Sequence, residues 1–445
     1  MENLTDEINE YNYNDAIAKL KNAVEYLLNP EKEQDFRKFL ILCKLSAFQG
    51  NYKAQYILGL LYGYGLQSLE YYFDTEIVNP NIVIEKNYEE ALEWFEKSAD
   101  NGYEPAQFEA GYFYYSGDFI DIDYEKALKY FKMSQNKDSC FYLGIMYESG
   151  LGVKPDIDIA LRWYMESSRL GNPLGYLYLG NLYKREDTIE DNYEKAINSY
   201  LKAVELGNCK AAYALGEMYL YGQGVKADSK KAEKWFLQST ADGDPSGYCI
   251  IGFMYRNGQG VEVDYKKCFD YHMIAAEAGY LVSICQIGYL YHMGMGVEQN
   301  YTKAIEYYTK AAERGYIDAQ VNLGYIYYKG QGCEINYSLA KKWYQKAADK
   351  GCALAISNIG ELYKHGHGVE QDYKKAMAYY EEAFKAAQAE ESPEDIGLAI
   401  NNIGELYADG LGVDLNYHKA LELFEEALSY GYDSQDNIDK IKEKM

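Results

Sequence analysis

The side chains of this chain that could bind a metal ion or perform catalysis are few and scattered. Two of its histidines, His365 and His367, stand two positions apart in a glycine-flanked turn, a spacing that could chelate a divalent cation. Two ligands without a convergent third do not form a metal site, so we interpret them as solvent-exposed turn residues. The sequence contains no H-E-x-x-H, C-x-x-C or G-x-S-x-G pattern. We therefore expect no metal, no cofactor and no catalytic residue, and we expect that the protein is not an enzyme.

Paired glycines in the pattern Gly-x-Gly are the second feature that could do chemistry, because glycine-rich loops can hold a phosphate. Such a loop needs a preceding strand and a longer glycine pattern. Here the pairs follow helical segments and recur along the chain, so we interpret them as turns. They are Gly150/152, Gly222/224, Gly258/260, Gly294/296, Gly330/332, Gly366/368 and Gly410/412.

The eight cysteines indicate the compartment rather than a reaction. They occupy several phases of the repeat described below, and only Cys249 and Cys285 share one. A disulfide between these two is the alternative to buried free thiols, which are common in proteins. The start of the chain is acidic and has no secretory signal, and no apolar run reaches the roughly 18 residues that span a membrane. We therefore expect a cytoplasmic protein that does not enter a membrane.

The elements that position all these residues follow from a repeat. Glycine recurs every 36 residues from Gly144 to Gly360, and a fixed period of this length is typical of a stacked solenoid. A small residue stands five positions before each of these anchor glycines, and a tyrosine stands three positions after. The ten anchor glycines that can be aligned are Gly59, Gly111, Gly144, Gly180, Gly216, Gly252, Gly288, Gly324, Gly360 and Gly404.

The segment 317–351 shows what one repeat should look like. Ala319 and Leu323 lie at helical spacing on one face of a first helix. Gly330 then ends this helix, because glycine adopts the left-handed backbone of a helix C-terminus at little cost. Asn336 is a good N-cap for a second helix that ends near residue 351. Each repeat is thus predicted to be a helix–turn–helix hairpin, with the anchor glycine letting its two helices approach closely.

With this pattern the chain resembles the Sel-one-like repeat (SLR) family, which is related to the tetratricopeptide repeats. The family signature, A-x-x-x-L-G-x-x-Y-x-x-G-x-G-V-x-x-D/N-Y-x-K-A, is almost intact in Ala319–Gly351 and recurs over about residues 35–431. The resemblance implies an all-α fold, a right-handed α/α superhelical solenoid of about ten 36-residue helix–turn–helix repeats. It also implies an adaptor that brings proteins together or regulates an enzyme.

The predicted organisation has three parts. Residues 1–50 hold N-terminal helices, one of them over 12–28, and a degenerate capping repeat; 51–432 form the solenoid; and 433–445 form a C-terminal cap. Two insertions interrupt the period, at 66–84 and at 386–395. Insertions in repeat proteins map to loops on one face and often carry binding, although drift of a surface loop explains them equally well.

The charge of the chain limits its partners. Lys and Arg total 44 against 69 Asp and Glu, which gives a formal net charge of −25. Such a surface repels the phosphate backbone, so we expect no nucleic-acid partner. A basic or neutral protein or peptide is favoured instead.

The predicted interaction surface is a stripe on the first helices, which line the concave face in tetratricopeptide-like stacks. We place the stripe at positions −3, +1 and +4 from each anchor glycine. Tyrosine offers rigid contact area with a polar tip, which suits recognition, but 51 tyrosines leave packing and compositional bias as the alternative. Toward the C-terminus the stripe turns polar, at Ser357, Glu361, Lys364, Asn401 and Glu405. The candidate partner-binding residues are Tyr56, Phe108, Tyr112, Tyr115, Phe141, Tyr213, Phe253, Arg256, Tyr289, His292, Tyr325 and Tyr328.

The function predicted from these features is that of a monomeric, non-catalytic scaffold or adaptor that binds a peptide or protein along the concave groove. The first alternative is an acidic regulatory or inhibitory partner of one enzyme, which would cover a basic active site. A weaker alternative is carbohydrate binding, because aromatic faces also stack on sugars.

Overall fold

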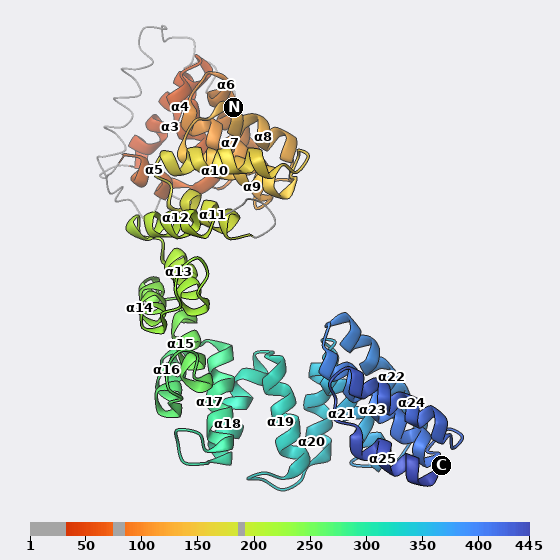
Figure 1. Ribbon diagram of the computed structural model, residues 1–445. Helices are drawn as coiled ribbons and strands as arrows, with labels where there is room; N and C mark the ends of the chain where they lie inside the picture. The colour runs from red at the N-terminus through yellow and green to blue at the C-terminus, as the bar shows by residue number, and fades with distance from the viewer. Residues whose placement is uncertain (1–32, 74–84, 186–191) are drawn as a thin grey trace. The chain divides into compact units, whose positions relative to one another are not determined.

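A computed structural model describes residues 33–73, 85–185 and 192–445. Throughout these residues the chain is helical, with 23 α-helices and no strand, and it forms two compact units, Met1–Lys226 and Ala227–Met445 (Figure 1). Unit 1 contains α3 (Glu33–Phe48), α4 (Tyr52–Tyr64), α5 (Leu66–Phe73), α6 (Tyr88–Asp100), α7 (Glu104–Ser116), α8 (Tyr124–Met133), α9 (Lys137–Ser149), α10 (Ile157–Arg169), α11 (Pro173–Lys184), α12 (Tyr193–Glu205) and α13 (Cys209–Tyr221).

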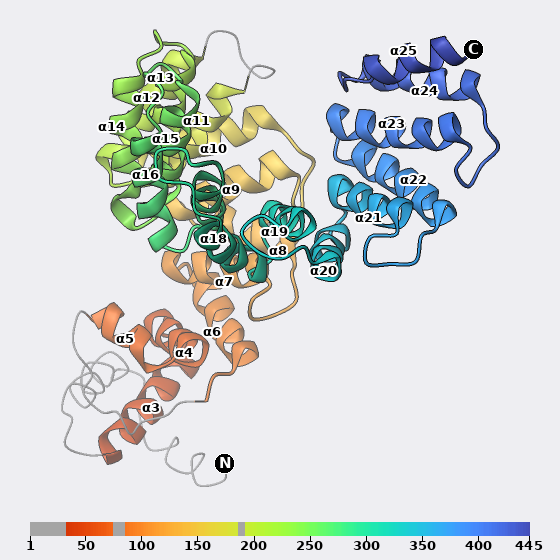
Figure 2. The same cartoon turned by 90° about the horizontal axis from the view of Figure 1, so that it is seen from below.

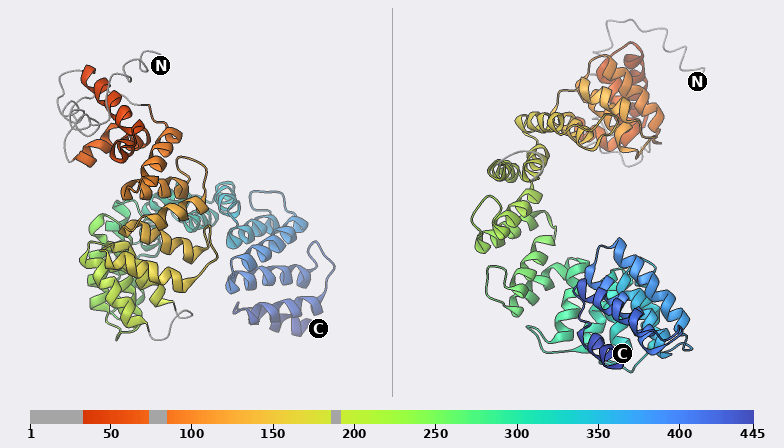
Figure 3. Two further views of the ribbon diagram at one scale, coloured as in Figure 1. Left: turned by 90° about the horizontal axis from the view of Figure 1, so that it is seen from above. Right: turned by 45° about the vertical axis from the view of Figure 1, so that its right-hand side comes forward.

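Unit 2 continues the same alternation of first and second helices, and Figure 3 shows the hairpins of each unit following one another in chain order. Its helices are α14 (Ser229–Ser239), α15 (Ser246–Asn257), α16 (Tyr265–Glu277), α17 (Leu281–Met293), α18 (Tyr301–Glu313), α19 (Ile317–Lys329), α20 (Tyr337–Ala348), α21 (Ala353–His365), α22 (Tyr373–Ala389), α23 (Pro393–Asp409), α24 (Tyr417–Ser429) and α25 (Gln435–Lys444). Figure 2 shows α21 to α25 layered in this order. The predicted all-α repeat solenoid is confirmed.

Local chemistry sets the ends of the helices as predicted. Gly330 has a φ of 69°, in the left-handed region, and its N–H donates to the carbonyl oxygen of Ile326 at the end of α19. The side chain of Asn336 accepts a hydrogen bond of 3.0 Å from the backbone N–H of Leu339 and caps the start of α20. The same Asn or Asp cap recurs before α6, α8, α10, α14, α16, α18, α22 and α24.

Nine of the ten anchor glycines, all except Gly216, are seen to lie under an aromatic ring of their own second helix. A Cβ atom added to Gly324 would stand 2.5 Å from the ring of Tyr344, which is only 2 % exposed. The close approach predicted for the hairpin is therefore a contact between the glycine backbone and a buried ring. The equivalent pairs are Gly59–Phe95, Gly111–Phe131, Gly144–Tyr164, Gly180–Tyr200, Gly252–His272, Gly288–Tyr308, Gly360–Tyr380 and Gly404–Phe424.

The insertion at 386–395 is not the surface loop that the sequence predicts. Helices α22 and α23 are each 17 residues long, whereas most of the other helices have 12 or 13, so the additional residues add one turn to each helix. The added turns are packed, since Ala387 and Ile396 are buried together with Ala353. A loop of this composition would leave Ile396 in solvent, and burial of its apolar surface favours the helical extension.

The described part of the first insertion is the helix α5, from which Tyr72 packs on α4 and on the loop before α7. The ring centroid of Tyr72 lies 5.6 Å from that of Tyr56, and its hydroxyl lies 3.3 Å from the hydroxyl of Tyr103. This helix therefore packs against α4 and against the residue that precedes α7. The rest of this insertion and the helix predicted over 12–28 lie outside the described residues.

The C-terminal helix α25 closes the last hairpin. Ile438 and Ile441 are buried against Phe424 of α24. Over the part of the chain that the structure describes, no helix has both the length and the apolar character to span a membrane.

Candidate interaction surface

The first helices expose one face on the side away from their second helices. In α19, Ala319 and Leu323 are fully buried, whereas Tyr325 is 42 % exposed and Lys329 is also exposed. Counted from the anchor glycine, the accessible positions of α19 are −6, −2, +1 and +5, and we call the residues at these positions of the first helices the exposed stripe. The stripe is interrupted at the two ends of the array, where Ile57 and Leu60 of α4 and Asn402 of α23 are buried. First helices of successive repeats touch one another (α7 with α9, α9 with α11, α21 with α23), which places the exposed stripe on the inner side of the stack within a unit.

Four of the predicted site residues lie on this exposed stripe. They occupy position +1, and three of them are half-buried while Tyr325 is exposed. These residues are Tyr112, Phe253, Tyr289 and Tyr325.

The predicted residues at position −3 are not free for a partner. Tyr56 is 7 % exposed and Phe141 is 6 % exposed, so the prediction is wrong for both. The ring of Phe141 packs edge-on against Tyr178 of the next repeat, with centroids 5.0 Å apart. Phe108 and Tyr213, the other two at this position, are half-buried. Position −3 faces the following repeat and contributes to the core.

The predicted residues at position +4 tie neighbouring repeats together. Tyr115 packs edge-on against Tyr142 with centroids 5.0 Å apart. The Arg256 guanidinium donates to Gln286 at 2.7 Å. The Nε2 of His292 lies at a hydrogen-bond distance of 2.9 Å from the side-chain oxygen of Gln331 in the following repeat. The hydroxyl of Tyr328 lies 3.2 Å from the Nδ1 of His367, also in the following repeat. These four side chains act mainly as contacts between repeats.

The exposed stripe is therefore rotated around the helix axis by about 60° from the predicted one, since each residue turns the helix by about 100°. The prediction correctly identified the flank that the second helix covers, but it ignored the flank that the next repeat covers. If both the flank facing the second helix and the flank facing the next repeat are assumed to be buried, positions −2 and +5 are the accessible ones in place of −3 and +4. The residues missed in this way include Glu109, Tyr142, Tyr178, Gln286, Asn322 and Met293.

In unit 1 the exposed stripe forms an aromatic patch around one carboxylate. The rings of Tyr112 and Tyr142 meet edge-on with centroids 5.7 Å apart. The hydroxyl of Tyr64, on the preceding first helix, donates to the Glu109 carboxylate at 2.5 Å. Burial raises the pKa of Glu109, and the hydrogen bond from Tyr64 opposes this only in part. We call Tyr64, Glu109, Tyr112 and Tyr142 the unit 1 patch.

In unit 2 the corresponding patch already contains cations from the chain itself. The guanidinium of Arg256 lies over the rings of Phe253 and Tyr289, at 5.1 and 5.8 Å from their centroids. The ammonium of Lys329 lies 5.8 Å from the ring of Tyr325. We call Phe253, Arg256, Tyr289 and Tyr325 the unit 2 patch.

The polar residues at the C-terminal end of the predicted stripe are largely inaccessible to a partner. Lys364 is buried between Glu405, at 2.5 Å, and Glu361, at 3.7 Å. Asn401 is also buried and accepts hydrogen bonds from Ser434 and from Asn437 of α25. These polar residues hold the last helices together and expose little contact area.

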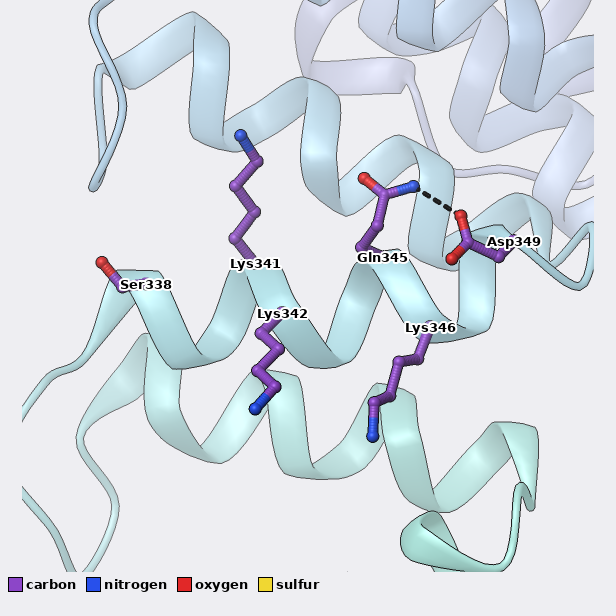
Figure 4. Close-up of a pocket in the computed structure, with 6 residues that line it drawn as sticks. All are labelled: Ser338, Lys341, Lys342, Gln345, Lys346 and Asp349. Atoms are coloured by element: carbon purple, nitrogen blue, oxygen red, sulfur yellow. Dashed lines mark hydrogen bonds between the residues drawn. The ribbon is translucent and has the colours of Figure 1, made fainter.

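A shallow hollow of about 440 Å³ lies on the outer side of unit 2, along the second helix α20. Figure 4 shows Lys341 pointing away from Lys342 and Lys346, toward the neighbouring helix. Lys341 donates to the Tyr363 hydroxyl, and the ammonium of Lys346 lies over Trp343. The lysines diverge and two of them already have partners, so the hollow does not form a converging site.

No group of three or more potential metal ligands is present among residues 33–73, 85–185 and 192–445. All eight cysteines are free, so the alternative of a disulfide between Cys249 and Cys285 is wrong. Burial raises the pKa of the Cys249 thiol to about 11 and that of Cys285 to about 12.

We expect these buried thiols to react slowly. Because the thiolate is the nucleophile, Cys249 and Cys285 should react with 5,5′-dithiobis(2-nitrobenzoate) at least 100-fold more slowly in the native protein than in urea. The half-buried Cys209 should react early and serves as the internal control. Fast modification of Cys249 or Cys285, located by mass spectrometry, would contradict the packing of α15 and α17.

Comparison with known proteins places the repeats in a family. A family model described as the Sel1 repeat matches residues 53–71, 82–103, 104–134, 137–172, 173–208, 209–244, 245–280, 282–316, 317–352, 353–387 and 397–431. The first two matched segments flank the first insertion and hold α4 and α6 of a single hairpin, so the matches correspond to the ten repeats predicted.

Two solved structures share the fold. A protective antigen of uropathogenic Escherichia coli with an SLR fold is 27% identical, with a TM-score of 0.59, over 100% of this chain and 90% of that one. A Sel1 repeat protein from Oxalobacter formigenes is 27% identical, with a TM-score of 0.54, over 72% of this chain and 89% of that one.

Curated relatives match shorter segments. An Arabidopsis thaliana protein described as the ERAD-associated E3 ubiquitin-protein ligase component HRD3B is 30% identical over 131 residues, which is 28% of this chain and 17% of that protein. The DAP3-binding cell death enhancer 1 of Rattus norvegicus is 31% identical over 97 residues, 21% of this chain and 19% of that protein. The chain thus matches less than a fifth of the length of either relative.

Proposed function

The chain belongs to the Sel1 repeat family, and we propose that it is a non-catalytic scaffold that binds a peptide or protein partner along the exposed stripe of its first helices. Sel1 and related repeats in general mediate protein–protein interactions. The observation that carries the proposal is the unit 2 patch, where aromatic rings from successive repeats stand on the accessible side of their helices. Tyr289 and Tyr325 are at the same position of adjacent repeats, so an extended segment could contact both.

The chemistry of this surface suits recognition. Tyrosine buries a large ring at a small cost in side-chain entropy, and aromatic residues together with arginine are enriched among the residues that dominate binding energy. Several modest contacts along consecutive repeats add up when one segment spans them. Free thiols throughout the chain suit a reducing compartment, and we propose the cytoplasm.

Replacing Tyr289 and Tyr325 together with alanine is the direct test. We expect the proteins captured from a native lysate by the wild-type chain to be reduced at least tenfold, as measured by quantitative mass spectrometry. The thermal unfolding curve should change little, because Tyr325 is exposed and Tyr289 is only half-buried.

The matched control is the double replacement of Tyr265 and Tyr430 with alanine. These tyrosines are 36 % and 37 % exposed and belong to second helices or their ends, away from the exposed stripe. Capture that survives in the Tyr289 and Tyr325 variant, or that is lost equally in the control, would contradict the proposed surface. A collapse of the unfolding curve would show instead that the two rings are structural.

The same assay tests the alternative of an acidic regulator. Docking driven by the net charge of −25 weakens steeply as salt is raised, whereas contacts through aromatic rings weaken much less. We expect capture to persist at 0.5 M NaCl.

A further inference from the structure

Glu109 of the unit 1 patch is a carboxylate that has no cation beside it among the residues that the structure describes. One of its oxygens accepts the hydrogen bond from Tyr64, and the residue is half-buried on the accessible face of α7. No lysine, arginine or histidine of the described residues forms an ion pair with it. Its raised pKa reflects the free-energy cost of keeping this carboxylate charged while partly desolvated.

Other carboxylates on the first helices do have a cation from the chain itself. Glu148 pairs with Arg185 at 3.1 Å, and Glu217 pairs with Lys184 at 2.9 Å. In the second pair the cation is at position +4 of one repeat and the carboxylate is on the first helix of the next. Glu109 therefore departs from the pattern of its own unit.

Unit 2 shows what kind of group fits beside this position. There Arg256, at position +4, reaches the next first helix, where Gln286 at position −2 accepts from its guanidinium. The guanidinium also lies over the ring of Tyr289, at position +1 of the same helix. One arginine is thus held by an oxygen at −2 and a tyrosine ring at +1.

Unit 1 has the same acceptor and ring positions but lacks the arginine. Glu109 is at −2 and Tyr112 is at +1, as Gln286 and Tyr289 are in unit 2. The preceding repeat has Gly63 at position +4, so no cation reaches Glu109 from that position, and the side chain that does reach it from the preceding first helix is the uncharged Tyr64 at position +5. At position −2, unit 2 has the neutral amide of Gln286 and unit 1 has the carboxylate of Glu109. A carboxylate binds a guanidinium more strongly than an amide does.

Within the described part of unit 1, the aromatic rings near Glu109 also have no cation over them. On other faces of unit 1, Lys126 lies 4.7 Å from the ring centroid of Tyr114, and Lys129 lies 4.5 Å from that of Tyr130. No such cation lies over Tyr112 or Tyr142 among the residues described. Phe131 stacks on one face of Tyr142, with centroids 5.3 Å apart. The ring faces that remain open are negative and attract cations, as the Glu109 carboxylate does.

We propose that Glu109, with the rings of Tyr112 and Tyr142, binds an arginine side chain of the partner protein. The carboxylate oxygen not used by Tyr64 accepts from the guanidinium, and the guanidinium plane stacks on a tyrosine ring. The proposal rests on the proposed function, and it specifies that the partner segment is basic where it crosses unit 1. The net charge of −25 draws such a segment toward the chain.

The test titrates the full chain with N-acetyl-Gly-Gly-Arg-Gly-Gly-amide and follows binding by ligand-observed NMR. The comparison peptide has citrulline, which keeps the planar shape without the charge. We expect the arginine peptide to bind, the citrulline peptide to bind at least tenfold more weakly, and Glu109→Gln to reduce the affinity for the arginine peptide about tenfold. A third peptide with lysine in place of arginine shows whether the site binds any cation or requires the planar guanidinium group.

The matched control is Glu93→Gln, an exposed glutamate on the second helix α6, which should bind as the wild type does. A thermal melt of Glu109→Gln verifies that the fold is kept, since glutamine can still accept from Tyr64. The proposal is overturned if the arginine peptide fails to bind the wild type, if citrulline binds equally, or if Glu109→Gln has no effect.

These outcomes are separable from those of the proposed function. Capture that depends on Tyr289 and Tyr325, combined with failure of the arginine peptide, rejects the Glu109 site and leaves the unit 2 surface in place. Binding of the arginine peptide without any such capture rejects the unit 2 surface alone.

Discussion

Replacing Gly324 with alanine should lower the free energy of unfolding of unit 2 by about 2 kcal/mol. In an exposed helix the same change would raise stability by about 1 kcal/mol, because alanine has the higher helix propensity. Here the new methyl group would stand 2.5 Å from the ring of Tyr344, which is buried and cannot move aside. Overpacking of this kind costs about 3 kcal/mol and therefore outweighs the gain in propensity. Urea unfolding followed by circular dichroism measures the change, and hydrogen exchange in α19 and α20 locates it.

A double-mutant cycle shows whether the ring is the cause. Tyr344→Leu removes the ring and should destabilise the hairpin by itself. In the double variant Gly324→Ala/Tyr344→Leu, the methyl group enters space that the ring has left, so the combined loss should be about 1–2 kcal/mol smaller than the sum of the single losses. Additive losses, or a Gly324→Ala variant as stable as the wild type, would mean that the contact between glycine and ring is not tight.

The pH dependence of unit 2 should contain a contribution from His272 of about 2 kcal/mol between pH 6.5 and 4.5. His272 occupies the place of the buried ring over Gly252 and is 0 % exposed. Burial, and secondarily the charge of Arg256, lower its pKa from 6.5 to about 4. Between these values the unfolded chain binds the proton and the folded chain does not, so stability falls as the pH falls through this range.

The groups that face His272 support this assignment. The Nδ1 of His272 lies 3.1 Å from the Ser283 hydroxyl, and its Nε2 has no hydrogen-bond partner in the described part of the chain. The ring of Phe253 packs edge-on against the imidazole, with centroids 4.9 Å apart, and has no group that titrates.

The comparison variant is His272→Phe, since phenylalanine occupies the equivalent place in other repeats. Loss of the partner of Ser283 shifts its stability by a similar amount at every pH, so the informative quantity is the slope. Urea unfolding at a series of pH values should give a shallower acid dependence for His272→Phe than for the wild type. Parallel curves for the two proteins would refute the assignment.

Much of the fold could be predicted because it depends on interactions within one repeat. The turn at Gly330 requires a positive φ, and the cap at Asn336 requires a side-chain acceptor, so both are readable from local residue types. The anchor glycine is equally readable as a close helix approach. Its partner, the ring 20 positions later, is also in the sequence, but only the structure shows that the ring lies on the glycine.

The candidate surface was predicted less well because it depends on contacts between repeats. Helical periodicity identifies the face of a first helix that its second helix buries, but gives no sign of the face that the next repeat covers. Phe141 and Arg256 therefore looked like free groove residues, although one is in the core and the other bonds to the next first helix. Glu109 was missed for the same reason. It is a candidate because the preceding repeat has Gly63 at position +4, where other repeats have a cation that reaches the next first helix.

The extra turns of α22 and α23 have a consequence for how such chains can vary. Four residues added to each helix advance it by about 6 Å along the hairpin axis, which is perpendicular to the direction in which hairpins are stacked. The packing within each of the two hairpins is set elsewhere, at the anchor glycines, where Gly360 keeps its contact with Tyr380 and Gly404 keeps its contact with Phe424. The added turns thus lie on two helices that pack on each other across the junction of two repeats, and they match in length, so a junction can be lengthened while the glycine–ring contact inside each hairpin is kept.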